Sequence, residues 1–234
     1  MISIRLRTLP LLSSLLFACL LAGTASGAIL VNRSYIVFDP AKPREDVIIS
    51  NPTKEKAYLE IEVLEVTAPG TPEEKWERAT DPEKIGLIAA PRRIAIPAGG
   101  QRMVRLVNIN GYDDQEHIYR LHVKPVSGGA QEVQGKGFAL KVLVGYQLLL
   151  VVPPRTPVYA LEAQRGGNQL VLKNSGNSNI LLYDGKQCDA AGDCASVSNV
   201  RLYPGNSRSL ELPRDAPVTF SVTSGKSTET RTFP

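Results

Sequence analysis

The sequence is poor in the side chains that build metal and catalytic centres, with three cysteines and two histidines among 234 residues. His117 and His122 lie far in sequence from the cysteines, so a zinc site, which takes four ligands, is not expected. The motifs G-x-S-x-G, H-E-x-x-H, G-x-G-x-x-G and the Walker loop are absent after residue 27. A hydrolase would have to use one of the two histidines, which are better explained as polar positions beside a sheet. We therefore expect no enzyme, no metal and no cofactor.

Aromatic side chains and net charge are limited as well. Aromatic residues make up 6% of the chain, and the one tryptophan, Trp76, lies in an acidic segment. A secreted adhesin or carbohydrate-binding module, which is the main alternative function, would be expected to present exposed aromatic platforms. The net charge is +4, and two of the positive charges are arginines at positions 5 and 7. This balance gives no indication of nucleic-acid binding.

One hydrophobic run stands apart near the start of the chain. Two arginines precede an apolar stretch at 9–21, and small residues follow through Gly27. This pattern predicts a secretory signal peptide over residues 1–27, so the rest of the chain is expected to be exported without inserting into the membrane. A lipid-modified Cys19 is the alternative, but the apolar run continues past it.

Cys188 and Cys194 are the only cysteines outside the signal peptide. Export favours a disulfide between them, and two free thiols are the alternative. The bridge would close a short loop and stabilise the fold by on the order of 2 kcal/mol. We therefore expect it mainly to stiffen a protruding loop.

The apolar residues beyond position 28 alternate with polar ones or form short runs that glycine, proline, asparagine and aspartate interrupt. This pattern is typical of β-strands and not of helices. The predicted strands are 30–38, 46–50, 57–66, 85–89, 93–96, 102–107, 118–124, 138–152, 159–163, 170–173, 180–183, 200–202, 209–212 and 217–222.

A proline-rich segment, residues 153–157 (PPRTP), divides these strands into two groups and is expected to be a stiff linker. About seven strands in each group, at this spacing, are typical of an immunoglobulin-like sandwich. The sequence therefore predicts an all-β protein with two Ig-like β-sandwich domains in tandem, over residues 28–152 and 158–234.

The segment 138–152 (FALKVLVGYQLLLVV) is far longer than a typical strand. Its even-numbered residues project to one face, and the other face is also apolar at Ala139, Leu143, Leu149 and Val151. A long apolar edge strand left bare promotes aggregation, so the second face needs a partner. Three interpretations stay open: a strand in the middle of the sandwich, a homodimer contact, or a platform to which a strand of another protein is added.

Four segments, in order, carry a resemblance to a known family. They are residues 32–39 (NRSYIVFD), 49–51 (ISN), 97–105 (PAGGQRMVR) and the long strand that runs into Pro153. This set resembles the periplasmic pilus chaperones of the chaperone–usher pathway, the PapD-like group. The resemblance implies two Ig-like domains set at an angle, a periplasmic location in a Gram-negative bacterium, and two partners, namely pilin subunits and an outer-membrane usher.

The resemblance also implies donor-strand complementation, in which the long strand fills the groove of a pilin that lacks one strand. The candidate client-binding residues are Phe138, Leu140, Val142, Val144, Tyr146 and Leu148. Without a client, we expect the segment 125–137 or self-association to cover this strand, because large apolar patches are rarely left exposed.

The best-known branch of the family binds the terminal carboxylate of the pilin with an arginine on the first strand and a lysine near the end of the long strand. The matching positions here are Tyr35 and, within one residue, Leu148 or Leu149, which cannot neutralise a carboxylate. The sequence therefore resembles the alternative or archaic branches more closely. The candidate anchors for the client carboxylate are Arg120 first, then Lys124, and then Arg105 and Arg33.

Overall fold

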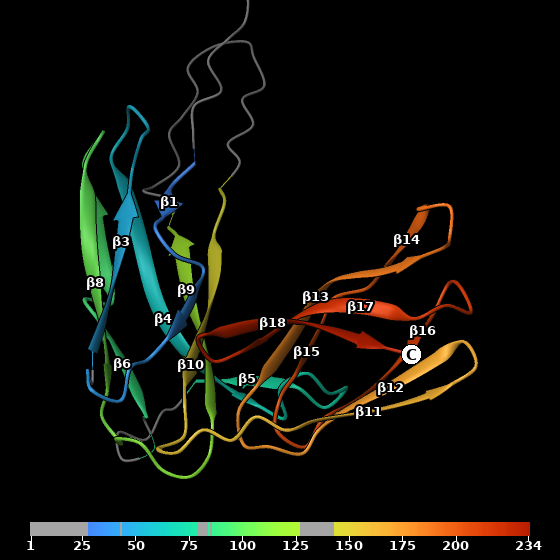
Figure 1. Cartoon of the computed structure of the whole chain (residues 1–234). Coiled ribbons are helices and arrows are strands. Elements are labelled where there is room, and N and C mark those ends of the chain that lie inside the picture. The colour runs from blue at the N-terminus through green and yellow to red at the C-terminus, as the bar shows by residue number, and fades with distance from the viewer. Residues whose placement is uncertain (1–27, 43, 79–83, 85, 127–142) are drawn as a thin grey trace, which may run out of the picture.

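The computed structural model describes residues 28–42, 44–78, 84, 86–126 and 143–234. The named elements in this part of the chain are all β-strands, so the predicted all-β class is confirmed (Figure 1). Within the same residues, no helix is long and apolar enough to span a membrane. The predicted signal peptide, residues 1–27, lies outside the described residues.

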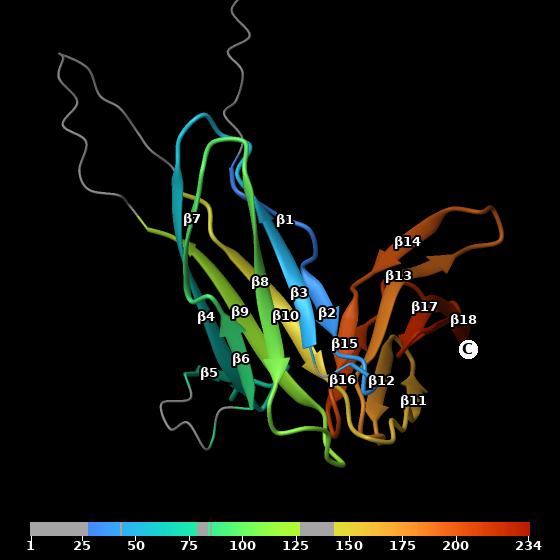
Figure 2. The same ribbon diagram turned by 90° about the vertical axis from the view of Figure 1, so that its left-hand side faces the viewer.

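Two sheets form the first sandwich (Figures 1 and 2). The β3 sheet contains, in spatial order, β1 (Leu30–Val31), β3 (Arg44–Ser50), β8 (Gln101–Asn108) and β6 (Leu87–Ala90). The β9 sheet contains β2 (Tyr35–Val37), β10 (Tyr146–Val152), β9 (His117–Pro125), β4 (Ala57–Thr67) and β5 (Lys75–Glu77), and β7 (Arg93–Ile96) also pairs with β4.

The alternation of side chains along β9 decides what each face of its sheet presents. Tyr119, Leu121 and Val123 point into the core of the first sandwich, where they pack with residues of both sheets. Because successive side chains point to opposite faces, Arg120 and His122 lie on the outer face together with Lys124. The polar outer face of this sheet is therefore built by the same strand that fills the core.

The chain crosses from one sheet to the other near its first strands. The single strand predicted over 30–38 is wrong in this respect, because β1 pairs with β3 whereas β2 pairs in parallel with β10. At the crossing, the Asn32 side chain accepts a hydrogen bond from the Ile48 amide at 2.9 Å. As a result, β2 covers one edge of β10 only from Leu149 to Val151.

The long strand predicted over 138–152 is a strand in the described residues only over Tyr146–Val152. Its upstream part, 138–142, lies outside the described residues, and residues 143–145 are exposed and carry no strand. Leu148 and Leu150 belong to the core of the first sandwich, whereas Val151 packs against Tyr203 of the second half of the chain. The second sandwich is thus an apolar partner that the three sequence interpretations did not include.

The second sandwich has its own pair of sheets and its own core around Phe220. One sheet contains β11 (Leu161–Gly166), β12 (Gln169–Asn174) and β16 (Ser207–Glu211). The other contains β14 (Cys194–Val197), β13 (Ile180–Cys188), β17 (Val218–Ser224) and β18 (Ser227–Phe233), and β15 (Val200–Leu202) also pairs with β13.

The hairpin of β13 and β14 protrudes from the second sandwich in both views (Figures 1 and 2). A disulfide joins Cys188 to Cys194 near its end, so the predicted bridge is confirmed. The Arg214 side chain adds ion pairs to Asp189 at 2.9 Å and to Asp193 at 2.5 Å. Covalent and charged contacts therefore hold the end of this hairpin.

The two sandwiches meet at an angle along the outer face of the β9 sheet (Figure 1). Tyr203, which follows β15, packs in an apolar cluster with Val66, Ile118 and Val151 of the first sandwich. The Asn206 side chain donates a hydrogen bond to the Pro69 carbonyl at 2.8 Å. The outer face of one sheet therefore becomes one wall of a cleft between the sandwiches.

Candidate functional site

The candidate site is a row of side chains on the outer face of the β9 sheet. Tyr35 lies opposite Leu149, Leu149 lies opposite Arg120, and Arg120 lies opposite Leu64, on four adjacent strands. Residues directly opposite each other share one face of a sheet. We call these four residues the cleft row, because they lie beside the contact with the second sandwich.

Arg120 is held in the cleft row by an aromatic ring. Its guanidinium carbon lies 5.2 Å from the centre of the Trp76 ring, which itself meets His122 edge-on at 5.7 Å. The Arg120 Nε is buried without a hydrogen-bond partner, as is the His122 Nε2. Within the described residues, no carboxylate forms an ion pair with Arg120, so its charge is available to a ligand.

Lys124 is neutralised by a neighbour on the same face. Its Nζ donates to one oxygen of Glu62 at 2.5 Å, and Arg78 donates to the other oxygen at 2.5 Å. Burial acts to raise the pKa of Glu62, but the hydrogen bonds from Lys124 and Arg78 outweigh it and hold that pKa below its ordinary value. Burial, Lys124 and Arg120 together lower the pKa of His122. Arg120 is therefore a better candidate anchor than Lys124.

The buried carboxylate of Glu62 leads to a stability prediction. The change Glu62→Gln is expected to lower the free energy of unfolding at pH 7 by about 1–3 kcal/mol, because it removes the acceptor of two charged hydrogen bonds. The folded pKa is depressed, so this stabilisation is present above the ordinary pKa of 4.5 and is lost as the pH falls through the lower folded value. Urea unfolding of both proteins from pH 7 to pH 3 would measure the difference, which should shrink with acid.

Glu60 provides the matched control for that experiment. It lies two residues earlier on the same face of β4, and its ion pair with Arg93 is exposed and long, at 3.9 Å. Exposed ion pairs contribute little, so Glu60→Gln should change the free energy of unfolding by less than about 0.5 kcal/mol. A difference for Glu62→Gln that is independent of pH would contradict the assigned role of its charge.

The other two candidate anchors do not lie in the cleft row. Arg105, on β8 of the opposite sheet, forms an ion pair with Asp46 at 2.9 Å. Arg33, at the crossing between β1 and β2, pairs with Glu45 at 2.9 Å. The structure therefore brings together Arg120 and Lys124 and leaves Arg105 and Arg33 with carboxylates of their own.

The second sandwich contributes a cation that the sequence did not single out. The guanidinium carbon of Arg201, on β15, lies 4.8 Å from the centre of the Tyr35 ring, and its Nη1 reaches the Tyr35 hydroxyl at 3.4 Å. The same Nη1 donates to the side-chain oxygen of Asn179. Asn179 in turn donates to the Glu116 carboxylate from its backbone and side chain, at 3.0 and 2.7 Å. No local pattern marks Arg201, because only the docking of the sandwiches brings it to Tyr35.

The candidate client-binding residues fall into three groups. Phe138, Leu140 and Val142 lie outside the described residues. Val144 is 44% exposed, whereas Leu148 is fully buried in the core of the first sandwich. The Tyr146 hydroxyl donates to the Ile29 carbonyl at 2.5 Å. Because β2 begins opposite Leu149, the part of β10 before Leu149 has no strand partner on that edge within the described residues.

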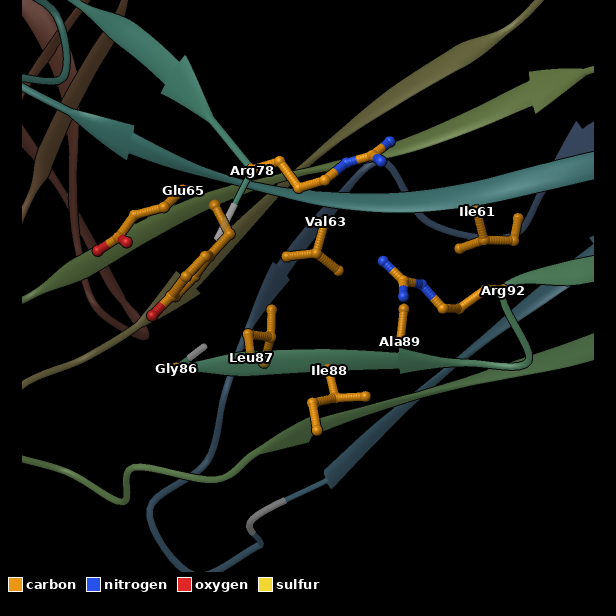
Figure 3. A pocket seen from close by; sticks show the side chains of 10 residues that line it. Ile61, Val63, Glu65, Arg78, Gly86, Leu87, Ile88, Ala89 and Arg92 are labelled. Carbon is orange, nitrogen blue, oxygen red and sulfur yellow. The ribbon is translucent and has the colours of Figure 1, made fainter. Parts of the chain in front are cut away.

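A separate cavity of about 180 Å³ opens between β4 and β6 (Figure 3). Ile61, Val63 and Leu87 line it on the core side of the β9 sheet, and Arg78 and Arg92 also border it. It therefore lies behind the sheet whose outer face carries the cleft row, and it does not belong to the candidate site.

No protein-family model matches the chain. A fimbrial protein of the CS1 system of Escherichia coli is 27% identical over 173 residues, which cover 70% of this chain and 72% of that protein. A fimbrial protein of the CFA/I system of Escherichia coli is 22% identical over 198 residues, which cover 76% of this chain and 80% of that protein.

Solved structures of fimbrial chaperones share the fold. The class 5 fimbriae chaperone CfaA matches with a TM-score of 0.63 and 20% identity, over 87% of this chain and 98% of that one. The Escherichia coli chaperone DraB matches with a TM-score of 0.61 and 19% identity, over 88% and 98%. The CsuC–CsuE chaperone–tip adhesion subunit complex of Acinetobacter baumannii gives 0.60 and 17%, over 88% and 98%. The resemblance drawn from the sequence is thus confirmed in the fold, with its two Ig-like domains.

Proposed function

We propose that this chain is a periplasmic chaperone of the chaperone–usher pathway, which holds unassembled fimbrial subunits by donor-strand complementation and delivers them to an outer-membrane usher. The observation that carries the proposal is the fold, which matches fimbrial chaperones over 87–88% of the chain. One of those structures is a complex with a tip adhesion subunit, and the curated relatives are fimbrial proteins. The signal peptide at residues 1–27 would export the chain to the periplasm.

The long apolar segment supports the proposed mechanism. Strand addition needs a free main-chain edge and apolar side chains next to it. The edge of β10 before Leu149 is not covered by β2, and the sequence continues upstream with Phe138, Leu140, Val142 and the exposed Val144. Leu148 belongs to the core of the first sandwich, so we place the client-facing residues upstream of it.

Arg120 is the proposed anchor for the carboxylate at the end of the client. A carboxylate brought into an apolar cleft loses hydration and needs a charged donor in return. Arg120 has a charge that no carboxylate among the described residues neutralises, and it lies beside Leu149 at the end of the free edge. A fixed anchor would also define register, because a slip of one residue turns every apolar side chain to the wrong face.

Recovery of a subunit from the periplasm tests the proposed function. A fimbrial subunit encoded beside this gene should be recovered in soluble form about tenfold more with the chaperone than without it, since a partner that binds only the folded form stabilises it by mass action. A chaperone without residues 1–27 should give no increase, because it stays in the wrong compartment. Equal recovery of every neighbouring secreted subunit with and without the chaperone would show the proposal to be wrong.

A further inference from the structure

Two arginines from different sandwiches flank Leu149 in the cleft row. Arg120 of β9 lies on one side and packs on the Trp76 ring, whereas Arg201 of β15 lies on the other side and packs on the Tyr35 ring. Each ring holds its guanidinium group by a cation–π contact, which fixes the position of the group without neutralising its charge. Leu149 is therefore an apolar floor between two fixed cations.

The charges of both arginines lack a carboxylate partner. No ion pair within the described residues includes Arg120 or Arg201. Glu116 is close enough to Arg201 for that charge to act on its pKa, but Asn179 occupies its oxygens. An unpaired arginine beside an apolar contact is a site for an anion, because its planar fork matches a carboxylate.

Tyr203 shows that the two guanidinium groups act on one place. Its ring is buried at the contact of the two sandwiches. Burial raises the pKa of Tyr203, and Arg201 and Arg120 both act to lower it. Across the sheet, Tyr35 and Arg120 are separated by two strand spacings, about 10 Å between their Cα atoms. Side chains as long as arginine can reach a common ligand over Leu149 from the two ends of this span.

The topology indicates which carboxylate would reach this point. A strand added to the free edge of β10 meets the beginning of β2 opposite Leu149 and must end there. An added strand that runs parallel to β10, as β2 does, would place its C-terminal end at the cleft row. The ligand is therefore a terminal carboxylate on an extended segment, which the charge of the site also favours.

We propose that Arg201 of the second sandwich and Arg120 of the first bind one C-terminal carboxylate between them over Leu149, so that both sandwiches build the anchor. Tyr35 and Leu149 occupy the positions that match the two cations of the best-known branch, and the flanking arginines supply the missing charges. The identity of the carboxylate as that of a client protein rests on the proposed function. Arg201 is then a specificity residue for the end of the client chain.

A pair of peptides tests this anchor without a folded client. The probe is a short acetylated peptide of alternating valine and serine, prepared with a free C-terminal carboxylate and as the C-terminal amide. NMR titration would follow the side-chain Nε–Hε signals of Arg120 and Arg201. The free carboxylate is expected to shift both signals and to bind the wild-type protein about tenfold more tightly than the amide, since charge-assisted hydrogen bonds distinguish the two peptides.

Variants separate a direct role from a structural one. Arg201→Gln should remove the preference for the free carboxylate, whereas a merely structural role would weaken both peptides equally and leave their ratio unchanged. Arg231→Gln is the matched control, because Arg231 is also in the second sandwich and packs on an aromatic ring, Phe233, at 5.4 Å. It should keep the wild-type ratio.

The two proposals fail in different ways. A preference that survives in Arg201→Gln, equal binding of the two peptides, or no binding of either would overturn the anchor. Client recovery without any carboxylate preference would overturn the anchor alone. A carboxylate preference in a protein that recovers no client would overturn the chaperone function alone.

Discussion

Replacement of Leu140, Val142 and Val144 by serine is expected to abolish the recovery of client subunits while the chaperone stays folded. In donor-strand complementation these side chains fill the groove of the client, and each buried side chain contributes roughly 1.5–3 kcal/mol. Loss of three would weaken binding by about a thousandfold or more, and main-chain pairing would not compensate. Val144 is 44% exposed, so its replacement removes little packing from the first core.

The alternate residues of the same segment provide the control. Ala139, Lys141 and Leu143 would point to the opposite side of an extended strand, so their replacement by serine should have a smaller effect on recovery. Circular dichroism and urea unfolding would establish that both triple variants remain folded. Wild-type recovery from both of them would mean that this segment is not the donor strand.

Arg120→Ala is expected to lower client recovery by about ten- to a hundredfold, because a hydrogen bond to a charged group is worth about 1.5–3 kcal/mol and a desolvated carboxylate would lose its donor. The free protein should remain folded, since Arg120 loses only its cation–π contact with Trp76, which is worth about 0.5–1 kcal/mol at exposed sites. Co-purification of the chaperone with its client, together with urea unfolding of the chaperone alone, measures both effects.

Two arginines outside the cleft serve as controls for Arg120. Arg105→Ala removes an ion pair with Asp46 on the opposite sheet, and Arg165→Ala removes one with Asp215 in the second sandwich. Both should recover client as the wild type does. Wild-type recovery from Arg120→Ala would remove Arg120 from the site and leave the chaperone function itself unaffected.

The hydrophobic pattern was sufficient where burial alone decides the structure. The strand 93–96 and the strand 200–202 occur at the residues predicted, because their apolar side chains alternate and turn residues bound them. The strands β5, β14 and β18 were not predicted. They are polar or mixed in sequence, and hydrogen bonds to a neighbouring strand hold them in their sheets.

Local pattern failed where one apolar run serves two sheets. Residues 30–38 read as a continuous strand, yet the chain leaves one sheet after Val31 and enters the other at Tyr35. Alternation is a property of neighbouring residues, so it carries no information on which sheet a strand joins. The free edge of β10 depends on that crossing and was therefore not predictable.

Residue pattern was enough to establish the all-β class, the pairing of Cys188 with Cys194 as the natural disulfide, and Arg120 as a cation on one face of its strand. It could not establish that this face meets the second sandwich, or that Arg201 reaches Tyr35, a residue 166 positions away in the chain. A side-chain period of two assigns residues to faces, whereas the docking of two sandwiches through Tyr203 and its apolar cluster decides which faces meet.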